Sequence, residues 1–137
     1  KVKNKKIFQK KSLINIFRSN DIISLHIHVN KNTKNIINKK ILKYAKNDLL
    51  IVNTSRGELI NETDLINFLK KNKNAKYATD VLNDEIKNKK NNKLLKISKT
   101  SDQVLITPHI GGMTIEAQEI AYGRVMDLTN KFLQNFN

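Results

Sequence analysis

The sequence predicts an α/β fold, in which a parallel β-sheet carries helices on its faces. Four short apolar segments recur along the chain and are rich in Ile, Leu and Val: Ile22 to Ile27, Leu49 to Val52, Tyr77 to Val81 and Val104 to Ile106. Their length and composition are typical of buried strands. Segments with helical periodicity separate them, and strands that alternate with helices indicate a parallel sheet.

Two helices are expected between the strands. The first is predicted from the apolar spacing of Ile37, Ile41, Leu42 and Ala45, and the second from that of Leu65, Ile66, Phe68 and Leu69. Asn61 precedes the second helix and is its expected N-cap, because an Asn side-chain oxygen can accept from the first free backbone N–H groups.

The two ends of the chain and one charged stretch complete the predicted elements. Before the first sheet segment we expect a short strand at Lys6 to Phe8 and a helix over Ser12 to Phe17. Thr114 should cap a long C-terminal helix, whose apolar stripe contains Ala121, Val125, Leu128, Phe132 and Phe136. The charged, Asn-rich stretch Lys87 to Lys93 has no apolar anchor and is predicted to be an exposed loop.

The formal net charge of +14 raises binding to nucleic acid or to an anionic membrane as a hypothesis. The lysines, however, are scattered as doublets, and the chain is equally rich in Asn and Ile, which share A/T-rich codons with Lys. We therefore expect no nucleic-acid and no membrane partner. No apolar run approaches the roughly 20 residues that span a bilayer. The chain has no cysteine, and we expect no metal site.

Polar residues gather where the predicted strands end. The four strands are followed by His26-Ile27-His28, by Asn53-Thr54-Ser55-Arg56-Gly57, by Asp80 with Glu85, and by Thr107-Pro108-His109-Ile110-Gly111-Gly112. In an open parallel sheet, the ligand crevice lies beyond the carboxyl ends of the strands. A His paired with a carboxylate can transfer protons near neutral pH, and a nearby Arg can bind a substrate carboxylate.

Each of these residues also has a structural interpretation when taken alone. A His at a strand end is more often a hydrogen-bonded structural residue than a catalyst, and we interpret His26 and His28 in that way. Glu85 could simply be solvated, and Arg56 could clamp a neighbouring loop. The functional hypothesis therefore depends on the combination of residues and on their order.

That combination resembles the D-isomer-specific 2-hydroxyacid dehydrogenases in order and spacing, over about Ser12 to Phe132. The resemblance is carried by Ser24-Leu25-His26, by Asn53 to Gly57, by Asp80-Val81 with Glu85 five residues after the Asp, and by Thr107 to Gly112. The run Glu116-Ala117-Gln118-Glu119 is similar to phosphoglycerate dehydrogenase relatives within that family.

The resemblance implies an NAD-dependent oxidoreductase that acts on a small 2-hydroxy or 2-oxo acid, with NADP not excluded. Arg56 would bind the carboxylate and carbonyl of the substrate, His109 would give or take the hydroxyl proton, and Glu85 would hold His109. The implied cofactor-binding residues are Ile27, Thr54, Ser55, Arg56, Asp80, His109, Ile110, Gly111 and Gly112. The full-length protein is expected to be a cytoplasmic homodimer.

Two departures from the family are small and one is large. His28 and Ile86 stand where relatives commonly have Pro. No G-x-G-x-x-G turn occurs, because the only glycines are Gly57, Gly111, Gly112 and Gly123. We therefore predict a Rossmann-like, doubly wound parallel sheet that is incomplete at its N-terminal side. Residues 1–137 would form a partial dinucleotide-binding domain without a substrate domain.

The isolated chain is accordingly expected not to be fully active. An alternative hypothesis is a dinucleotide-binding scaffold without significant turnover, and a second is a nucleic-acid binder driven by charge.

Overall fold

The computed structural model describes residues 12–85 and 91–134. The chain forms two compact units, one ending at Ile106 and the other beginning at Thr107. The strand predicted at Lys6 to Phe8 and the stripe residue Phe136 lie outside the described residues.

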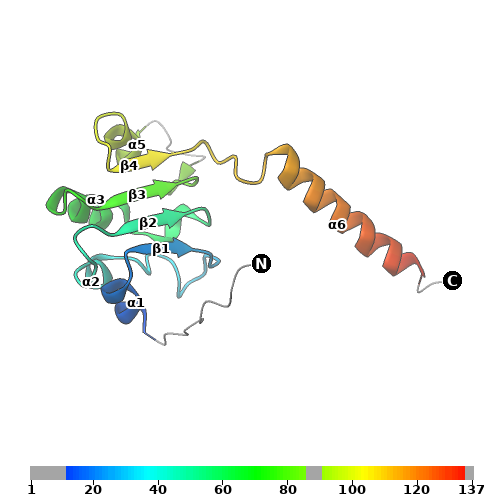
Figure 1. The fold of residues 1–137 in the computed structure, drawn as a ribbon, viewed down its shortest axis with the longest axis horizontal. Coiled ribbons are helices and arrows are strands. Elements are labelled where there is room, and N and C mark those ends of the chain that lie inside the picture. The colour runs from blue at the N-terminus through cyan, green and yellow to red at the C-terminus, as the bar shows by residue number, and fades with distance from the viewer. Residues whose placement is uncertain (1–11, 86–90, 135–137) are drawn as a thin grey trace, which may run out of the picture. The chain divides into compact units, whose positions relative to one another are not determined.

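The first unit contains a four-stranded sheet, in which all strands are parallel (Figure 1). It consists of β1 (Ile22–Leu25), β2 (Leu50–Asn53), β3 (Lys76–Thr79) and β4 (Val104–Ile106), which lie side by side in chain order. The predicted strands are confirmed to within about two residues at each end. The last residues of the strands are aligned across the sheet in the order Leu25, Asn53, Thr79 and Ile106. The four carboxyl ends therefore reach one edge at the same level.

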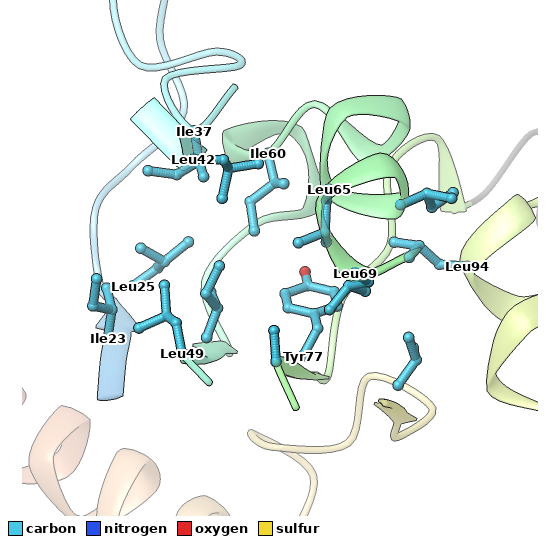
Figure 2. Packing of buried hydrophobic residues seen from close by; sticks show 14 of the residues in the cluster. Ile23, Leu25, Ile37, Leu42, Leu49, Ile60, Leu65, Leu69, Tyr77 and Leu94 are labelled. Atoms are coloured by element: carbon cyan, nitrogen blue, oxygen red, sulfur yellow. The ribbon is translucent and has the colours of Figure 1, made fainter. Parts of the chain in front are cut away.

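A single layer of helices covers one face of this sheet. It is formed by α1 (Leu13–Ser19), α2 (Lys39–Leu42), α3 (Glu62–Lys71) and α5 (Lys93–Ser98), and neighbours in that series contact one another. Alternate residues of β1 are buried, and the residues that share their rows, such as Ile51 and Tyr77, are buried as well. These strand side chains belong to one buried cluster with Leu65 and Leu69 of α3, and Figure 2 shows Tyr77 beside these two leucines. The predicted α/β fold is confirmed.

Two helical predictions need correction. The helix expected from Ile37 to Ala45 is only four residues long, because Ile37 instead forms a parallel bridge with Ile60. The loop expected at Lys87 to Lys93 is wrong at its end: Asn92 is only 8% exposed and caps α5, which begins at Lys93 and was not predicted.

Two predicted caps are present. The Asn61 side chain accepts from the backbone N–H of Asp64 and so caps α3. In the second unit, the Thr114 hydroxyl accepts from the N–H of Ala117 at 3.2 Å, at the start of α6 (Ile115–Gln134).

Among the described residues, no helix combines the length and the apolar character needed to cross a bilayer.

The buried Tyr77 makes the folding stability of the first unit depend on pH in the alkaline range. Burial is the main cause that raises the pKa of Tyr77 above its ordinary value of 10.0, and the nearby Glu62 carboxylate raises it further. Hydrogen bonds with Thr79 and Asn53 act in the opposite direction. Because the folded state holds this proton more tightly than the unfolded state, the associated stability is complete below pH 10 and is lost as the pH rises through the folded pKa.

Tyr77→Phe should therefore lower stability by about 1 kcal/mol at neutral pH, where a hydroxyl hydrogen bond is lost. The difference in stability between the two proteins should shrink as the pH rises above 10, because the variant has no phenol left to ionise. Thermal unfolding followed by circular dichroism from pH 7 to 12 measures both effects. Parallel stability curves for the two proteins would contradict the prediction.

Candidate functional site

The loop after β2 is shaped by the side chain of Asn53. Asn53 is fully buried, and its amide nitrogen donates to the carbonyl of Arg56 at 2.9 Å and to the Tyr77 hydroxyl at 3.3 Å. Its side-chain oxygen accepts from the N–H of Ser55 at 3.1 Å. An Asn that binds the backbone two and three residues ahead turns the chain sharply. Arg56 is therefore held at a defined point just beyond the carboxyl end of β2.

Direct hydrogen bonds join this loop to the ends of the neighbouring strands. The Ser55 hydroxyl donates to the carbonyl of Ile27 at 2.6 Å, which links the exits of β2 and β1. On the other side, the N–H of Asp80 donates to the carbonyl of Asn53 at 3.0 Å, and the Thr79 hydroxyl lies 2.9 Å from the same oxygen. The residues predicted to follow three of the strands thus lie next to one another at one edge of the sheet.

Arg56 is exposed at this edge. One guanidinium nitrogen, Nη1, donates to the carbonyl of Ser55 at 2.6 Å, and the structure gives the Arg56 side chain no other hydrogen bond to a described residue. A guanidinium carries five N–H donors in a planar fork. The remaining donors of Arg56 can therefore bind a carboxylate that approaches from solvent.

The two predicted carboxylates differ in their surroundings. Asp80 follows β3 directly and is 7% exposed, whereas Glu85 is half-buried and comes after a tight turn. In that turn Asp84 has a φ of 52°, which is the left-handed region of the backbone. Both carboxylates follow β3 and come from the same segment of the first unit.

Gly57 brings the Arg56 loop and the Glu85 loop together. A Cβ placed on Gly57 would overlap the backbone carbonyl group of Leu82 and the backbone nitrogen of Asn83. No glycine of the described residues has a positive φ, so this position requires glycine for space and not for conformation. Two main-chain segments are thus in direct contact between Arg56 and Glu85.

The remaining predicted residues belong to the second unit. His109 lies three residues beyond the end of β4 in the chain and has a φ of 60°. Ile110, Gly111 and Gly112 follow it, and Ile110 is exposed within its unit. The distance from His109 to Arg56 or Glu85 stays a prediction, as do the catalytic and cofactor-binding roles of all these residues.

Two hollows occur among the described residues, and the predicted residues of the first unit do not line them. The first has a volume of about 410 Å³, lies between α2 and α3, and has Leu42, Phe68 and Lys71 in its wall. The second has a volume of about 390 Å³ and a polar lining that includes Glu62, Asn83 and Asn92. Arg56, Asp80 and Glu85 line neither of them.

Sequence reasoning did not identify three residues that organise this edge: Gly57 as a contact, Glu62 and Asn92. Glu62 stands in the first turn of α3 and accepts from the backbone of Asn83 at 3.0 Å. The only signal in the sequence was an acidic residue directly after an N-cap, which usually indicates no more than a favourable interaction with the helix dipole.

Comparisons with known proteins support one family. Residues 1–111 match the family described as D-isomer specific 2-hydroxyacid dehydrogenase, NAD binding domain. The D-3-phosphoglycerate dehydrogenase of Methanocaldococcus jannaschii is 38% identical over 83% of this chain and 21% of its own length. The chain spans 21 to 38% of the length of four curated relatives that it matches.

Two solved structures are similar in fold. The D-lactate dehydrogenase of Aquifex aeolicus, complexed with NAD and lactic acid, has a TM-score of 0.71 and 28% identity, over 91% of this chain and 40% of that chain. An acyclic imino acid reductase in complex with NADPH and D-Arg has a TM-score of 0.76 and 29% identity, over 98% of this chain and 41% of that chain. The resemblance predicted from the sequence is confirmed: the chain belongs to the D-isomer specific 2-hydroxyacid dehydrogenase family, within its NAD-binding domain.

Proposed function

We propose that this chain supplies the nicotinamide half of the site in an NAD-dependent dehydrogenase that interconverts a 2-hydroxy acid and a 2-oxo acid. The observation that carries the proposal is the direct linkage of the three strand exits. Ser55 binds the exit of β1 and Asp80 binds the exit of β2, so Arg56 and Asp80 share one edge with the loop of Glu85. The guanidinium of Arg56 can bind the carboxylate of a small acid, and the carboxylate of Asp80 can accept from the amide of a cofactor.

Each residue has a distinct role in this proposal. Arg56 forks onto the substrate carboxylate and polarises the carbonyl at C2, where negative charge grows during reduction. His109 donates a proton to that oxygen during reduction and removes it during oxidation, and Glu85 orients the imidazole. The bound nicotinamide supplies the chemistry of hydride transfer to or from C2.

The residues at the edge fit the nicotinamide end of a dinucleotide. Asp80 offers carboxylate oxygens to the carboxamide N–H groups, and Thr54 is exposed directly after β2, the strand next to β3. The backbone near Ile27 and the run from His109 to Gly112 complete the proposed cofactor set. These 137 residues contain no glycine-rich turn for the pyrophosphate, so we propose that full turnover needs further parts of the protein, including a substrate domain. NAD is the proposed cofactor, and NADP remains an alternative.

We further propose that the full protein is a cytoplasmic homodimer that has no nucleic-acid or membrane partner. The scattered lysine doublets support the second point, because tight nucleic-acid binding needs a continuous basic face. Size-exclusion chromatography of the full protein with light scattering measures the oligomeric state. A binding titration with duplex DNA at physiological salt tests the absence of a nucleic-acid partner.

Arg56→Lys tests the proposed substrate contact. In the full gene product that contains these residues, the change should lower kcat/KM for reduction of a 2-oxo acid by about 10- to 100-fold, mostly through a higher KM. An ammonium cannot bind the carboxylate and the carbonyl oxygen together. NADH oxidation with a panel of 2-oxo acids measures the effect, and Arg18→Lys, on the exposed end of α1, is the matched control.

The assay also separates the two candidate functions. NADH binding without turnover on any 2-oxo acid would favour the dinucleotide-binding scaffold. Unchanged kinetics in Arg56→Lys would remove Arg56 from the substrate site.

A further inference from the structure

We propose that Glu62 is a positioning residue for Glu85, and this inference rests on the proposed function. Glu62 is the first residue of α3, and its Oε1 accepts from the backbone N–H of Asn83 at 3.0 Å. Asn83 lies two residues before Glu85 in the turn that follows β3. The carboxylate of Glu62 thus holds the backbone of the loop that carries the proposed partner of His109.

The same carboxylate also binds the chain where α5 begins. The side-chain amide of Asn92 donates to both oxygens of Glu62, at 3.0 and 2.9 Å. The Asn92 side-chain oxygen accepts from the N–H groups of Leu94 and Leu95 and caps α5. Glu62 therefore binds both Asn83, in the turn after β3, and Asn92, the N-cap of α5.

The turn before Glu85 depends on contacts from outside it. Asp84 has a φ of 52°, a conformation that is costly for a residue with a side chain unless the surroundings impose it. Two such contacts are present: Gly57 packs against the backbone of Leu82 and Asn83, and Glu62 accepts from Asn83. Gly57 provides close packing, whereas Glu62 provides direction, because a hydrogen bond fixes the orientation of the Asn83 peptide.

A second interpretation of Glu62 is purely local. An acidic side chain in the first turn stabilises a helix through the helix dipole, which requires its charge. Positioning through hydrogen bonds requires an acceptor oxygen and no charge. Gln retains one acceptor oxygen and loses the charge, so Glu62→Gln should act like the unmodified residue in a positioning role and like Glu62→Ala in a dipole role.

The test compares Glu62→Ala, Glu62→Gln and the control Glu58→Ala. Glu58 lies in η1 (Gly57–Leu59), and the structure gives its side chain no hydrogen bond to a described residue. In the 137-residue chain, Glu62→Ala should speed hydrogen exchange at the Asn83 amide by on the order of 10- to 100-fold. It should also move the carbon NMR signal of the Glu85 carboxyl. Glu62→Gln should restore most of both readouts, and Glu58→Ala should change neither.

In the full gene product, Glu62→Ala should lower kcat by about tenfold with little change in the KM for the 2-oxo acid, and Glu62→Gln should recover most of that loss. Equal behaviour of the Ala and Gln variants, or an unmoved Glu85 signal in Glu62→Ala, would overturn the inference. Absence of turnover in the unmodified protein would instead contradict the proposed function. The hydrogen exchange of Asn83 and the carboxyl signal of Glu85 would still decide whether Glu62 positions the loop.

Discussion

His109→Ala is expected to lower the turnover of the full gene product by about 100- to 10,000-fold, while the affinity for NADH stays close to that of the unmodified protein. His109 carries the only imidazole of the proposed set, and imidazole is the side chain most often used as a general acid or base. Binding of the dinucleotide is spread over many backbone and side-chain groups, so it does not depend on one side chain. The two measurements are steady-state NADH oxidation and calorimetric titration with NADH.

A matched control comes from the same kind of side chain at another strand exit, that of β1. His26 follows β1 directly, is exposed, and lies with its Nε2 2.7 Å from the Ser24 hydroxyl. If proximity of any imidazole to the sheet edge were enough, His26→Gln would reduce turnover as His109→Gln does. We expect His26→Gln to retain nearly full activity. A His109 variant with near-normal turnover would leave the dinucleotide-binding scaffold as the better hypothesis.

The strands were predictable because their signal is local. Each is a short run of β-branched and apolar residues, and burial of alternate residues in β1 agrees with a sheet that packs one face on helices. Helix α3 was predictable for the same reason, since its periodicity and the Asn61 cap lie within one segment. Local patterns of this kind give the type of element well and its ends less well.

The errors arose where distant residues decide the local structure. The segment from Ile37 to Ala45 has helical spacing, yet the N–H of Ile37 donates to the carbonyl of Leu59 and its carbonyl accepts from Asn61. Those bonds remove Ile37 from the helix. In the same way, Asn92 looked like part of a charged loop, but its side chain caps α5 and also donates to Glu62, 30 residues earlier in the chain.

The same distinction between local patterns and distant contacts applies to the candidate site. The types of side chain that follow each strand could be read from the sequence, and parallel strands place those residues at one edge. The contacts that hold these side chains in place could not be read from the sequence. Glu62 and Gly57 contact backbone groups that lie 21 or more residues away in the chain. Asn53 acts through hydrogen bonds within a sharp local turn. Backbone partners leave no side-chain pattern in a single sequence.

Gly57→Ala is expected to destabilise the first unit by at least about 3 kcal/mol, which corresponds to a drop in Tm on the order of 10 °C. The added methyl group would overlap the main chain of Leu82 and Asn83, and a main chain cannot rotate away as the end of a flexible side chain can. Relief therefore requires movement of the loop that carries Arg56, of the loop that carries Glu85, or of both.

Gly123→Ala is the matched control, because the same chemical change meets no atom within 4 Å. Gly123 lies inside α6, where Ala is favoured over Gly by about 1 kcal/mol, so this variant should be neutral or slightly stabilising. Thermal unfolding by circular dichroism compares the two variants with the unmodified chain. The change in Tm should have opposite signs in the two variants. The destabilisation at Gly57 comes from the contact with the main chain and not from the loss of glycine itself. A Gly57→Ala protein with unchanged Tm and an unmoved Asn83 amide signal would mean that the two loops are not in contact in solution. The proposal that the loops of Arg56 and Glu85 share one site would then lose its structural basis.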